Sequence, residues 1–302
     1  MNNILVSGLI NLETTLRVDA FPIEYSPVCY PFFGVKSTIS GVGFNVAKAL
    51  STLGDTVRLL SLVGNDPAGR LAFQEMETLK ISATYVDSQL DQTPQSVILF
   101  DSEGNRQINV DLKNIQDQKY PPELFNKALE DCDMAVLCNI NFSRPFLAMA
   151  HARNIPVATD VHAISNLDDR YNQDFMANAD ILFMSHENLP DEPEVWARQV
   201  LNRFRAEILV IGMGAAGALL AVKQDRSLDH IPPVKVRPVI NTVGAGDALF
   251  SCFVHDYLQT RDPHEAIRKA ILFASYKIGV NGAADGFLNS FQLDQLAREY
   301  LN

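Results

Sequence analysis

Residues 241–247 read Asn-Thr-Val-Gly-Ala-Gly-Asp, a stretch that joins a polar turn to a glycine-rich helix start. Beyond it, Leu249, Cys252 and Phe253 follow the i, i+3, i+4 spacing of one buried helical face. This spacing predicts a tightly packed helix that begins near Gly244. The rest of the chain can be interpreted as the framework that supports this turn.

The two glycines of this turn give it the properties of an anion site. Gly244 and Gly246 permit backbone conformations that are closed to other residues, and they let a ligand approach the main chain closely. Amides in the first turn of a helix lack helical partners and lie at the positive end of the helix dipole. Such a turn binds anions, and phosphate above all.

Asp247 places a carboxylate directly in this anion site, where it would repel a phosphate unless it had a chemical task. The natural task is that of a general base, which takes the proton from a hydroxyl group. The amides of Gly244, Ala245 and Gly246 would then hold the charge that develops on a transferring phosphoryl group. The pattern leaves one structural alternative open, an ordinary helix N-terminus with Asp247 as a capping acid.

Length and composition are those of an ordinary soluble enzyme. The chain has 302 residues, of which 47% are hydrophobic, and a formal net charge of -11. This charge argues against nucleic acid or an anionic membrane as a partner. The four cysteines are scattered, and the N-terminus has the pattern of neither a signal peptide nor a membrane span, so we expect a cytoplasmic protein. The six histidines do not have zinc-ligand spacing, so we expect no protein-bound metal cage.

Strand and helix patterns alternate along most of the chain. Such alternation predicts a parallel sheet with helices on both faces, which is an α/β fold, and we expect residues 1–302 to form a single domain. The predicted strands include residues 4–6, 56–63, 135–138, 157–159, 181–184 and 208–211, and the predicted helices include 122–130, 145–153, 195–203, 264–277 and 292–300.

Two segments depart from the alternation of strands and helices. Apolar and polar residues alternate over 16–20 and again over 108–112, which is typical of strands with one solvated face. We therefore expect a small antiparallel lid beside the main sheet, built from residues of about 12–40 and 93–112.

Residues 212–217 read Gly-Met-Gly-Ala-Ala-Gly and match the dinucleotide-binding fingerprint. That fingerprint requires a helix after the glycines, whereas residues 218–222 are short, apolar and strand-like. A dehydrogenase is therefore disfavoured, and we expect a strand-to-strand turn whose amides could still contact phosphate.

A second glycine-bearing loop precedes a predicted helix that ends at Gly54. Asn45 lies in the first turn of this helix. Its amide side chain could hold a hydroxyl-rich ligand, or it could cap the helix, and the pattern does not separate these two roles.

Several of these stretches, taken in order, resemble the ribokinase-like carbohydrate kinases of the PfkB family. Residues 241–247 are similar to the second signature of the family, 40–54 to the first, and 61–69 to a further block. The resemblance runs from about residue 4 to 290. It implies a three-layer α/β/α fold with a mostly parallel central sheet and a small β lid. In many members the lid covers the sugar and forms a dimer contact, so a homodimer is expected.

The resemblance also implies ATP-dependent phosphorylation of a hydroxymethyl group on a small sugar or nucleoside. Asp247 matches the general base, and the residues from Gly244 to Gly246 match the anion hole. Gly41, Gly43 and Asn45 match positions that hold the sugar. Glu13 stands where the family usually has an aspartate that hydrogen-bonds sugar hydroxyls. Its carboxylate is still a hydrogen-bond acceptor, but the side chain is longer by one methylene.

On the nucleotide side, the glycines of the 212–217 turn match the segment near the ATP phosphates, namely Gly212, Gly214 and Gly217. Asn281 resembles a residue that borders the adenine pocket. Ser185 and Asn188 occupy the family's Asn-x-x-Glu pattern, which is tied to magnesium and phosphate, and Glu187 could supply its carboxylate through a register shift.

Asn241 stands where a frequent aspartate is associated with monovalent-cation binding in some members, so dependence on potassium stays open. The departures over 185–188 and at Gly212 also keep a non-catalytic sugar- or nucleotide-sensing protein as an alternative. A nucleoside kinase of the same family is the second alternative, because the apolar content of the lid would suit a base.

Overall fold

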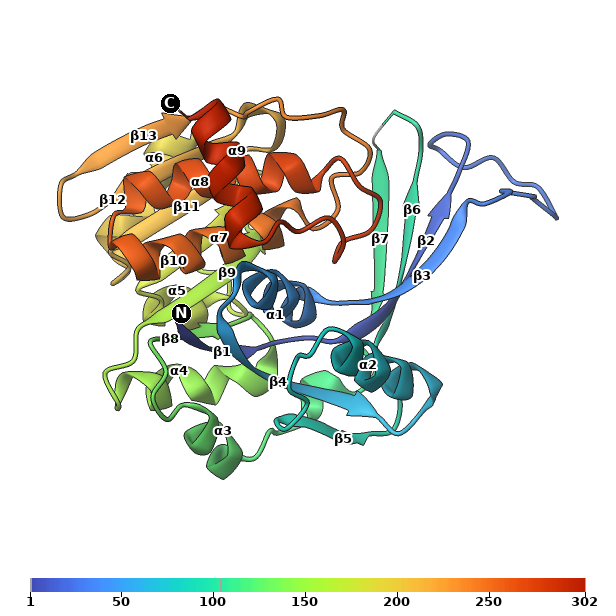
Figure 1. Ribbon diagram of the computed structural model, residues 1–302, viewed down its shortest axis with the longest axis horizontal. Helices are drawn as coiled ribbons and strands as arrows, with labels where there is room; N and C mark the ends of the chain where they lie inside the picture. Colours follow the sequence, from blue (N-terminus) through green and yellow to red (C-terminus); the bar gives the residue numbers. More distant parts are fainter. Residues whose placement is uncertain (1, 104, 302) are drawn as a thin grey trace.

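The computed structural model describes residues 2–103 and 105–301 and places a nine-stranded sheet at the centre of the chain. The strand order is β13-β12-β11-β10-β9-β8-β1-β4-β5 (Figure 1). The strands from β11 to β5 are parallel to their neighbours, whereas β12 and β13 run antiparallel. The expected mostly parallel sheet is confirmed. Its strands are β1 Asn3–Ser7, β4 Thr56–Gly64, β5 Val86–Leu90, β8 Met134–Leu137, β9 Val157–Ala163, β10 Ile181–Ser185, β11 Ile208–Gly212, β12 Ala218–Val222 and β13 Ser227–Ile231.

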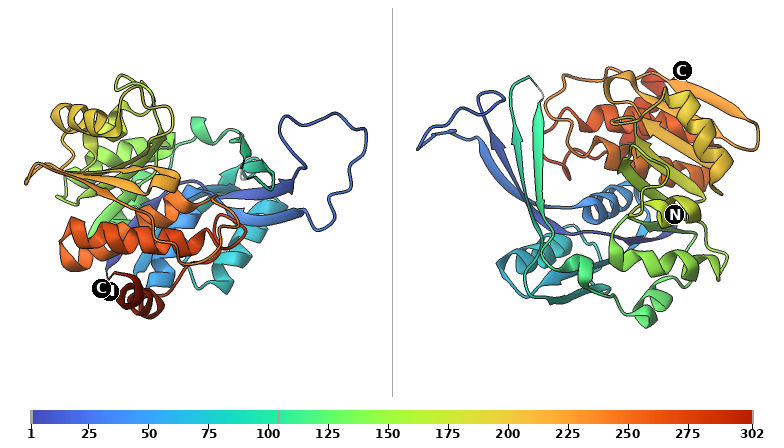
Figure 2. Two further views of the ribbon diagram at one scale, coloured as in Figure 1. Left: turned by 90° about the horizontal axis from the view of Figure 1, so that it is seen from above. Right: turned by 180° about the vertical axis from the view of Figure 1, so that it is seen from behind.

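Helices cover both faces of this sheet, as the predicted three layers require (Figures 1 and 2). One face carries α1 Val42–Leu53, α7 Ala245–Thr260, α8 Pro263–Lys277 and α9 Ser290–Tyr300. The other face carries α3 Pro122–Ala128, α4 Arg144–His151, α5 Gln173–Asn178 and α6 Pro193–Arg203. Alternate residues of β1 serve the two cores, because Ile4 and Val6 pack on the α1 side and Leu5 packs on the α4 side.

A second sheet of four strands forms the lid, in the order β3-β2-β6-β7. Its strands are β2 Asn11–Arg17, β3 Val35–Ser40, β6 Gln95–Phe100 and β7 Arg106–Asp111, and helix α2 Pro67–Thr78 contacts its base. The outer pairs are antiparallel but β2 and β6 are parallel, so the purely antiparallel lid expected from the alternation is wrong in that one pairing. The lid stands away from the main sheet, and the segment that joins β2 to β3 extends furthest from the body (Figure 2).

The turn over 212–217 joins two antiparallel strands, β11 and β12, which confirms the strand-to-strand connection. A 3-10 turn, η3 Gly214–Ala216, occupies its middle, and two more such turns occur at η1 Ile115–Asp117 and η2 Asn141–Ser143. Within residues 2–103 and 105–301, no helix has the length and apolar character needed to cross a membrane.

Candidate active site

The stretch 241–247, called the anion loop below, ends in the N-terminus of α7. Gly244 is the residue before the helix and has a φ of 77°, in the left-handed region. A side chain there would also clash with the carbonyl oxygen of Ala283, so only glycine fits. The helix begins one residue later, at Ala245, which confirms the predicted start.

The amides of the anion loop differ in their bonding. The Ala245 amide donates to the carbonyl oxygen of Thr242 at 3.2 Å. For the amides of Gly244 and Gly246 there is no acceptor among the described residues. A Cβ built on Gly246 would have no atom within 4 Å, so this position faces open space. The loop therefore presents unpaired donors where a ligand can approach.

Asp247 lies in the first turn of α7, and its carboxylate is held from the neighbouring helix. Asn45 Nδ2, in the first turn of α1, donates to Asp247 Oδ2 at 2.7 Å. Burial raises the pKa of Asp247, and the negative charge of Asp160 adds to this effect. The Asn45 bond and the electrostatic effects of His162 and Lys277 oppose it, but the net direction is upward.

A serine extends this contact into the lid. Ser40 Oγ lies 3.0 Å from Glu13 Oε2 and 3.2 Å from Asn45 Oδ1, and its single proton can serve one of the two acceptors at a time. Glu13, Ser40, Asn45 and Asp247 thus form one bonded chain, the carboxylate relay, which connects β2, the end of β3, α1 and α7. Three of these four residues were predicted as site residues. The bonding role of Ser40 was not.

Two buried acceptors in the lid lack donors. Glu13 Oε1 and Asn11 Oδ1 are buried, and neither accepts a hydrogen bond of normal geometry from a described residue, although the nearby backbone of Ala283 lowers the pKa of Glu13 to a small extent. Both residues lie on the same face of β2, because they are two positions apart in a strand. Burial raises the pKa of Glu13 despite the bond from Ser40. Asn11 was missed by the sequence reasoning, although its i, i+2 spacing from Glu13 was an available signal.

Gly41 and Gly43 act on the site through packing. Gly41 has a φ of 101°. Gly43 is buried, and a side chain on it would clash with the backbone of Gly8 at the end of β1. The start of α1 can therefore lie directly against β1, and this close approach positions Asn45 opposite Asp247.

The predicted nucleotide-side residues gather at the carboxyl ends of β10 and β11. Ser185 and Gly212 are partners in this parallel pair. His186 donates its amide to the Gly212 carbonyl oxygen at 2.9 Å, and Ser185 Oγ accepts the amide of Glu187 at 3.1 Å. A Cβ on Gly212 would lie 4.0 Å from Leu249 of α7, so this edge adjoins the helix that follows the anion loop.

The remaining predicted nucleotide residues divide into exposed and structural positions. Gly214 and Asn188 are exposed and have positive φ angles of 55° and 68°. Gly217 is buried, and its amide donates to the Gly214 carbonyl oxygen at 3.1 Å, so it shapes the turn without offering a free donor. Asn281 Oδ1 accepts from Asn241 Nδ2 at 2.8 Å, which ties the segment after α8 to the anion loop.

Arg106 of lid strand β7 reaches both halves of the site. Its Nη1 donates to Thr242 Oγ1 at 3.0 Å, and its Nη2 lies 3.9 Å from Glu187 Oε1. The lid is thereby in contact with the anion loop and with the nucleotide side. The sequence reasoning did not identify this arginine.

Lys277, the last residue of α8, is the second charged residue that the sequence reasoning missed. Its side chain is fully buried, and its Nζ donates to the carbonyl oxygen of Val243 in the anion loop. Burial lowers the pKa of Lys277 to about 8, although the negative charges of Asp247, Glu13 and Asp285 pull the other way.

The candidate metal ligand Glu187 lies at the edge formed by the ends of β10 and β11. Within the described residues, no group of three or more His, Cys, Asp or Glu side chains could hold a metal ion. The Glu187 side chain is 62% exposed beside Ser185. Magnesium in nucleotide sites commonly takes one or two carboxylates together with phosphate oxygens and water, and Glu187 has the chemistry for that role.

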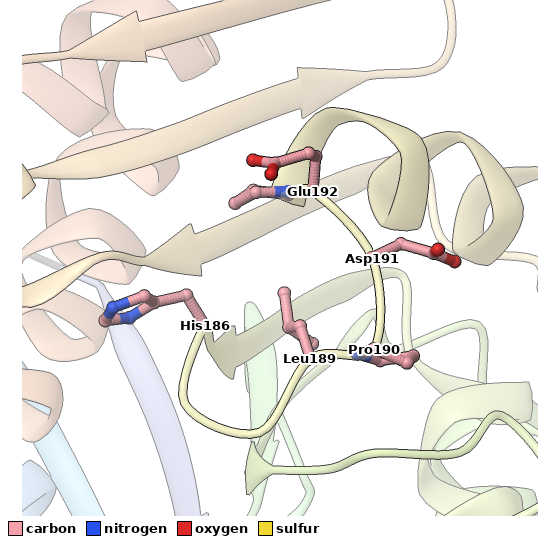
Figure 3. Close-up of a pocket in the computed structure, with 6 residues that line it drawn as sticks. His186, Leu189, Pro190, Asp191 and Glu192 are labelled. Carbon is pink, nitrogen blue, oxygen red and sulfur yellow. The ribbon is translucent and has the colours of Figure 1, made fainter.

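A cavity of about 480 Å³ lies next to the nucleotide side, between the end of β10 and the start of α6. It is lined by His186, Leu189, Pro190, Asp191, Glu192 and Pro193. Figure 3 shows the imidazole of His186 and the carboxylate of Glu192 extending to the same side of the loop, away from Asp191. None of the residues of the carboxylate relay lines this cavity, so it is separate from the candidate base.

Comparison with known sequences gives a match over nearly the whole chain. The family described as "pfkB family carbohydrate kinase" matches residues 1–289. A deoxyribokinase from Salmonella typhimurium is 26% identical over 305 residues, covering 97% of each chain. A guanosine-inosine kinase from Exiguobacterium acetylicum is 24% identical, covering 83% of this chain and 88% of its own.

Comparison with solved structures gives the same fold. A microbiome-derived acarbose kinase superimposes with a TM-score of 0.88 at 25% identity, with 99% of each chain covered. Ribokinase from Giardia lamblia superimposes with a TM-score of 0.84 at 17% identity, again over 99% of each chain, and at that identity the likeness shows the fold alone.

Proposed function

The chain belongs to the PfkB family of carbohydrate kinases, and we propose that it transfers the γ-phosphoryl group of ATP to a hydroxymethyl group of a small sugar. One observation supports the roles that we assign to Asp247 and to the anion loop in this reaction. The bond from Asn45 to Asp247 holds a carboxylate beside the unpaired amides of the anion loop. A capping acid would instead accept an amide of its own helix start, whereas the donor to the Asp247 carboxylate among the described residues is Asn45 Nδ2 of α1.

In the proposed reaction, Asp247 accepts the proton of the acceptor hydroxyl. The hydroxyl oxygen forms a bond to the γ-phosphorus, and the bond between that phosphorus and the bridging oxygen breaks, so ADP leaves. Negative charge on the phosphoryl oxygens is stabilised by the amides of Gly244 and Gly246. The raised pKa of Asp247 makes it a stronger base than an ordinary aspartate.

The acceptor is proposed to be rich in hydroxyl groups. Glu13 Oε1 and Asn11 Oδ1 are buried acceptors without donors, and leaving such atoms unpaired costs about 1–3 kcal/mol each. A sugar supplies the missing O–H donors. Both atoms belong to the face of β2 that carries the carboxylate relay, which is where a hydroxyl presented to Asp247 would have its neighbours.

A nucleoside as acceptor is favoured by one feature of the lid. Ile108 pairs with Ile98, and Val110 pairs with Ser96, which in turn pairs with Glu13, so these side chains share the face of Glu13. Ile108 and Val110 are about half exposed. An apolar wall beside buried acceptors suits a ligand with one flat apolar part and one polyol part.

The nucleotide is proposed to bind along the ends of β10 and β11, where Ser185, Asn188, Gly212, Gly214 and Asn281 are candidate contacts. Glu187 would hold magnesium that arrives with ATP. Bound there, the ion would neutralise charge on the phosphates. Arg106 already touches both Thr242 and Glu187, and it would add a fixed positive charge on the lid side.

The lid is also the proposed contact of a homodimer. Val35 and Val97 lie on the lid face opposite to Glu13 and are 57% and 42% exposed. Tyr25, Tyr30 and Phe32, in the segment between β2 and β3, are also exposed. Sedimentation of the purified chain should show twice the monomer mass, and a monomer at every concentration would contradict this contact.

The function is tested by an ATP-consumption assay with a panel of sugars and nucleosides, run on the wild type and on Asp247→Asn. We expect ADP to form with at least one acceptor in the wild type, and the acceptor separates the sugar kinase from the nucleoside kinase. Ligand binding without ADP formation across the panel would favour the sensing protein suggested by the altered 185–188 segment.

A further inference from the structure

Lys277 has no part in the reaction described above, yet its placement is costly. Its side chain is fully buried, and none of the carboxylates in the described chain lies within 4 Å of its ammonium group. Asp285, an acidic neighbour, is instead paired with Lys36 at 2.8 Å and with Lys48 at 3.5 Å. Burying an ammonium group without an ion pair costs free energy. The presence of Lys277 at this position therefore indicates a role for its charge.

The hydrogen bond of Lys277 fixes a particular peptide group. Its ammonium donates to the carbonyl oxygen of Val243, and this carbonyl shares a peptide unit with the amide of Gly244. In a planar trans peptide, the C=O and N–H bonds point in opposite directions. Holding the carbonyl toward Lys277 therefore turns the Gly244 N–H away from the protein interior and toward the side where it has no protein partner.

The charge of Lys277 also acts on the site. Opposite charges surround it from three elements, namely Glu13 of β2, Asp247 of α7 and Asp285 after α8, and Arg106 of β7 is the like charge that faces it. A cation bound to one end of a peptide group polarises it and makes the N–H at the other end a stronger donor. The ammonium thus favours both an ionised Asp247 and an anion held by the loop.

We propose that Lys277 is a positioning residue that serves as a tethered cation of the active site, orienting and polarising the Val243–Gly244 peptide so that its amide can bind the transferring phosphoryl group. This inference rests on the proposed phosphoryl transfer. A dissolved monovalent cation could hold the same carbonyl, but the lysine brings a charge that does not dissociate. With the lysine in this role, turnover is expected to be independent of potassium.

The first test needs no variant. Turnover of the wild type is measured in potassium, sodium and choline chloride at matched ionic strength. We expect the same kcat in all three salts, within experimental scatter. Activation by potassium of several fold would overturn the proposal, because the site would then need a cation that Lys277 is said to replace.

The second test compares Lys277→Met, which keeps the length of the side chain, with Lys223→Met. Lys223 also donates to a backbone carbonyl, that of Phe204 at 3.2 Å, but it lies at the far end of β12. We expect kcat to fall about 10- to 1000-fold in K277M, at most the loss seen when an oxyanion donor itself is removed, with the KM for sugar little changed. K223M should keep the wild-type kcat. Equal kcat values in K277M and the wild type would overturn the proposal.

Thermal stability and chemical rescue of kcat distinguish a lysine that only stabilises the fold from one that acts on the active site. Removing an unpaired buried charge should leave the thermal midpoint of K277M equal to or above that of the wild type, whereas a merely structural lysine predicts a lower midpoint and unchanged turnover. Ammonium or methylammonium chloride should restore part of kcat in Lys277→Ala, and sodium chloride should not. Absence of any rescue, together with a lowered midpoint, would contradict the proposed role.

Failure of the proposed phosphoryl transfer gives a different result from failure of the proposed role of Lys277. A wild type that consumes no ATP with any acceptor counts against phosphoryl transfer, and the lysine is then tested by binding of the ATP analogue AMP-PNP. Several-fold weaker binding in K277M, with K223M unchanged, would still support a charge that acts on the anion loop. Unchanged binding would overturn that as well.

Discussion

Asn45 donates a 2.7 Å hydrogen bond to Asp247 across 202 residues of sequence, and this bond joins the first turns of α1 and α7. Both helices begin with glycine-bearing turns, and the close approach of Gly43 to Gly8 allows them to meet. The carboxylate proposed as the base is therefore oriented by a residue of α1, which follows the other glycine-bearing turn. The pKa of the Asp247 carboxylate and the orientation of its side chain both depend on the bond from Asn45.

Loss of this contact should shift the acid limb of the activity profile. The Asn45 bond lowers the pKa of Asp247 against the effect of burial, so Asn45→Ala should raise that pKa further. Because the base acts when deprotonated, the acid-side inflection of kcat/KM should move to higher pH. A profile measured for both proteins would show the shift, and superimposable acid limbs would mean that Asn45 does not act on the base.

The decrease of kcat at alkaline pH should reflect the deprotonation of Lys277. Its pKa lies at about 8, and its ammonium form is the one that holds the Val243 carbonyl. As pH rises through that value the proton is lost, so kcat should fall above about pH 8 in the wild type. K277M has no such group, and its lower kcat should stay flat over the same range. An alkaline limb that persists unchanged in K277M would assign it to another residue.

The two glycines of the anion loop should respond differently to alanine. Gly244→Ala puts a side chain at a φ of 77° and against the Ala283 carbonyl oxygen, so the protein should lose about 1–3 kcal/mol of stability. Gly246→Ala adds a methyl group in open space within a helix, so stability should hold or rise by up to about 1 kcal/mol.

Turnover should not follow stability, because the more stable variant, Gly246→Ala, should have a strongly reduced kcat. The methyl group of G246A would stand where the phosphoryl group is proposed to approach, so kcat should fall about 100-fold in a fully folded protein. Thermal midpoints and turnover, measured on the same preparations, give both quantities. A stable G246A variant with wild-type turnover would place the phosphoryl group elsewhere.

Glu13 should govern acceptor binding more than turnover. Its Oε2 accepts from Ser40, and its Oε1 is left for a ligand. Glu13→Ala removes both acceptors, so the KM for the acceptor should rise about tenfold or more, as expected for loss of one or two bonds of 1.5–3 kcal/mol to a charged group. The KM for ATP should stay unchanged, which serves as the internal control.

Much of the fold and of this site follows from local sequence patterns. The anion loop, Asp247 and Asn45 were predicted because glycines followed by an apolar helical stripe have a local signature. The parallel sheet followed from the alternation of strands and helices. In the same way, the strand-like residues after Gly217 predicted a strand-to-strand turn, which the antiparallel pair β11 and β12 confirms.

The features that were missed depend on contacts distant in sequence. Strand β5 and strand β13 contain mostly polar or mixed residues, and helix α5 has only six residues, so none has a clear period. Lys277 ends a helix, where a lysine is ordinarily solvated, and only the fold shows that it is buried against Val243, 34 positions away. Ser40 was treated as a replaced glycine, because its bonds to Glu13 and Asn45 require three elements to meet.

The role of Asp247 as the base is measured by the single-turnover rate of phosphoryl transfer in Asp247→Asn with saturating ATP and acceptor. The asparagine keeps the size of the side chain while removing the base, so the rate should fall about 100- to 10,000-fold, with acceptor affinity by thermal shift retained. A single-turnover rate equal to that of the wild type would show that Asp247 takes no proton.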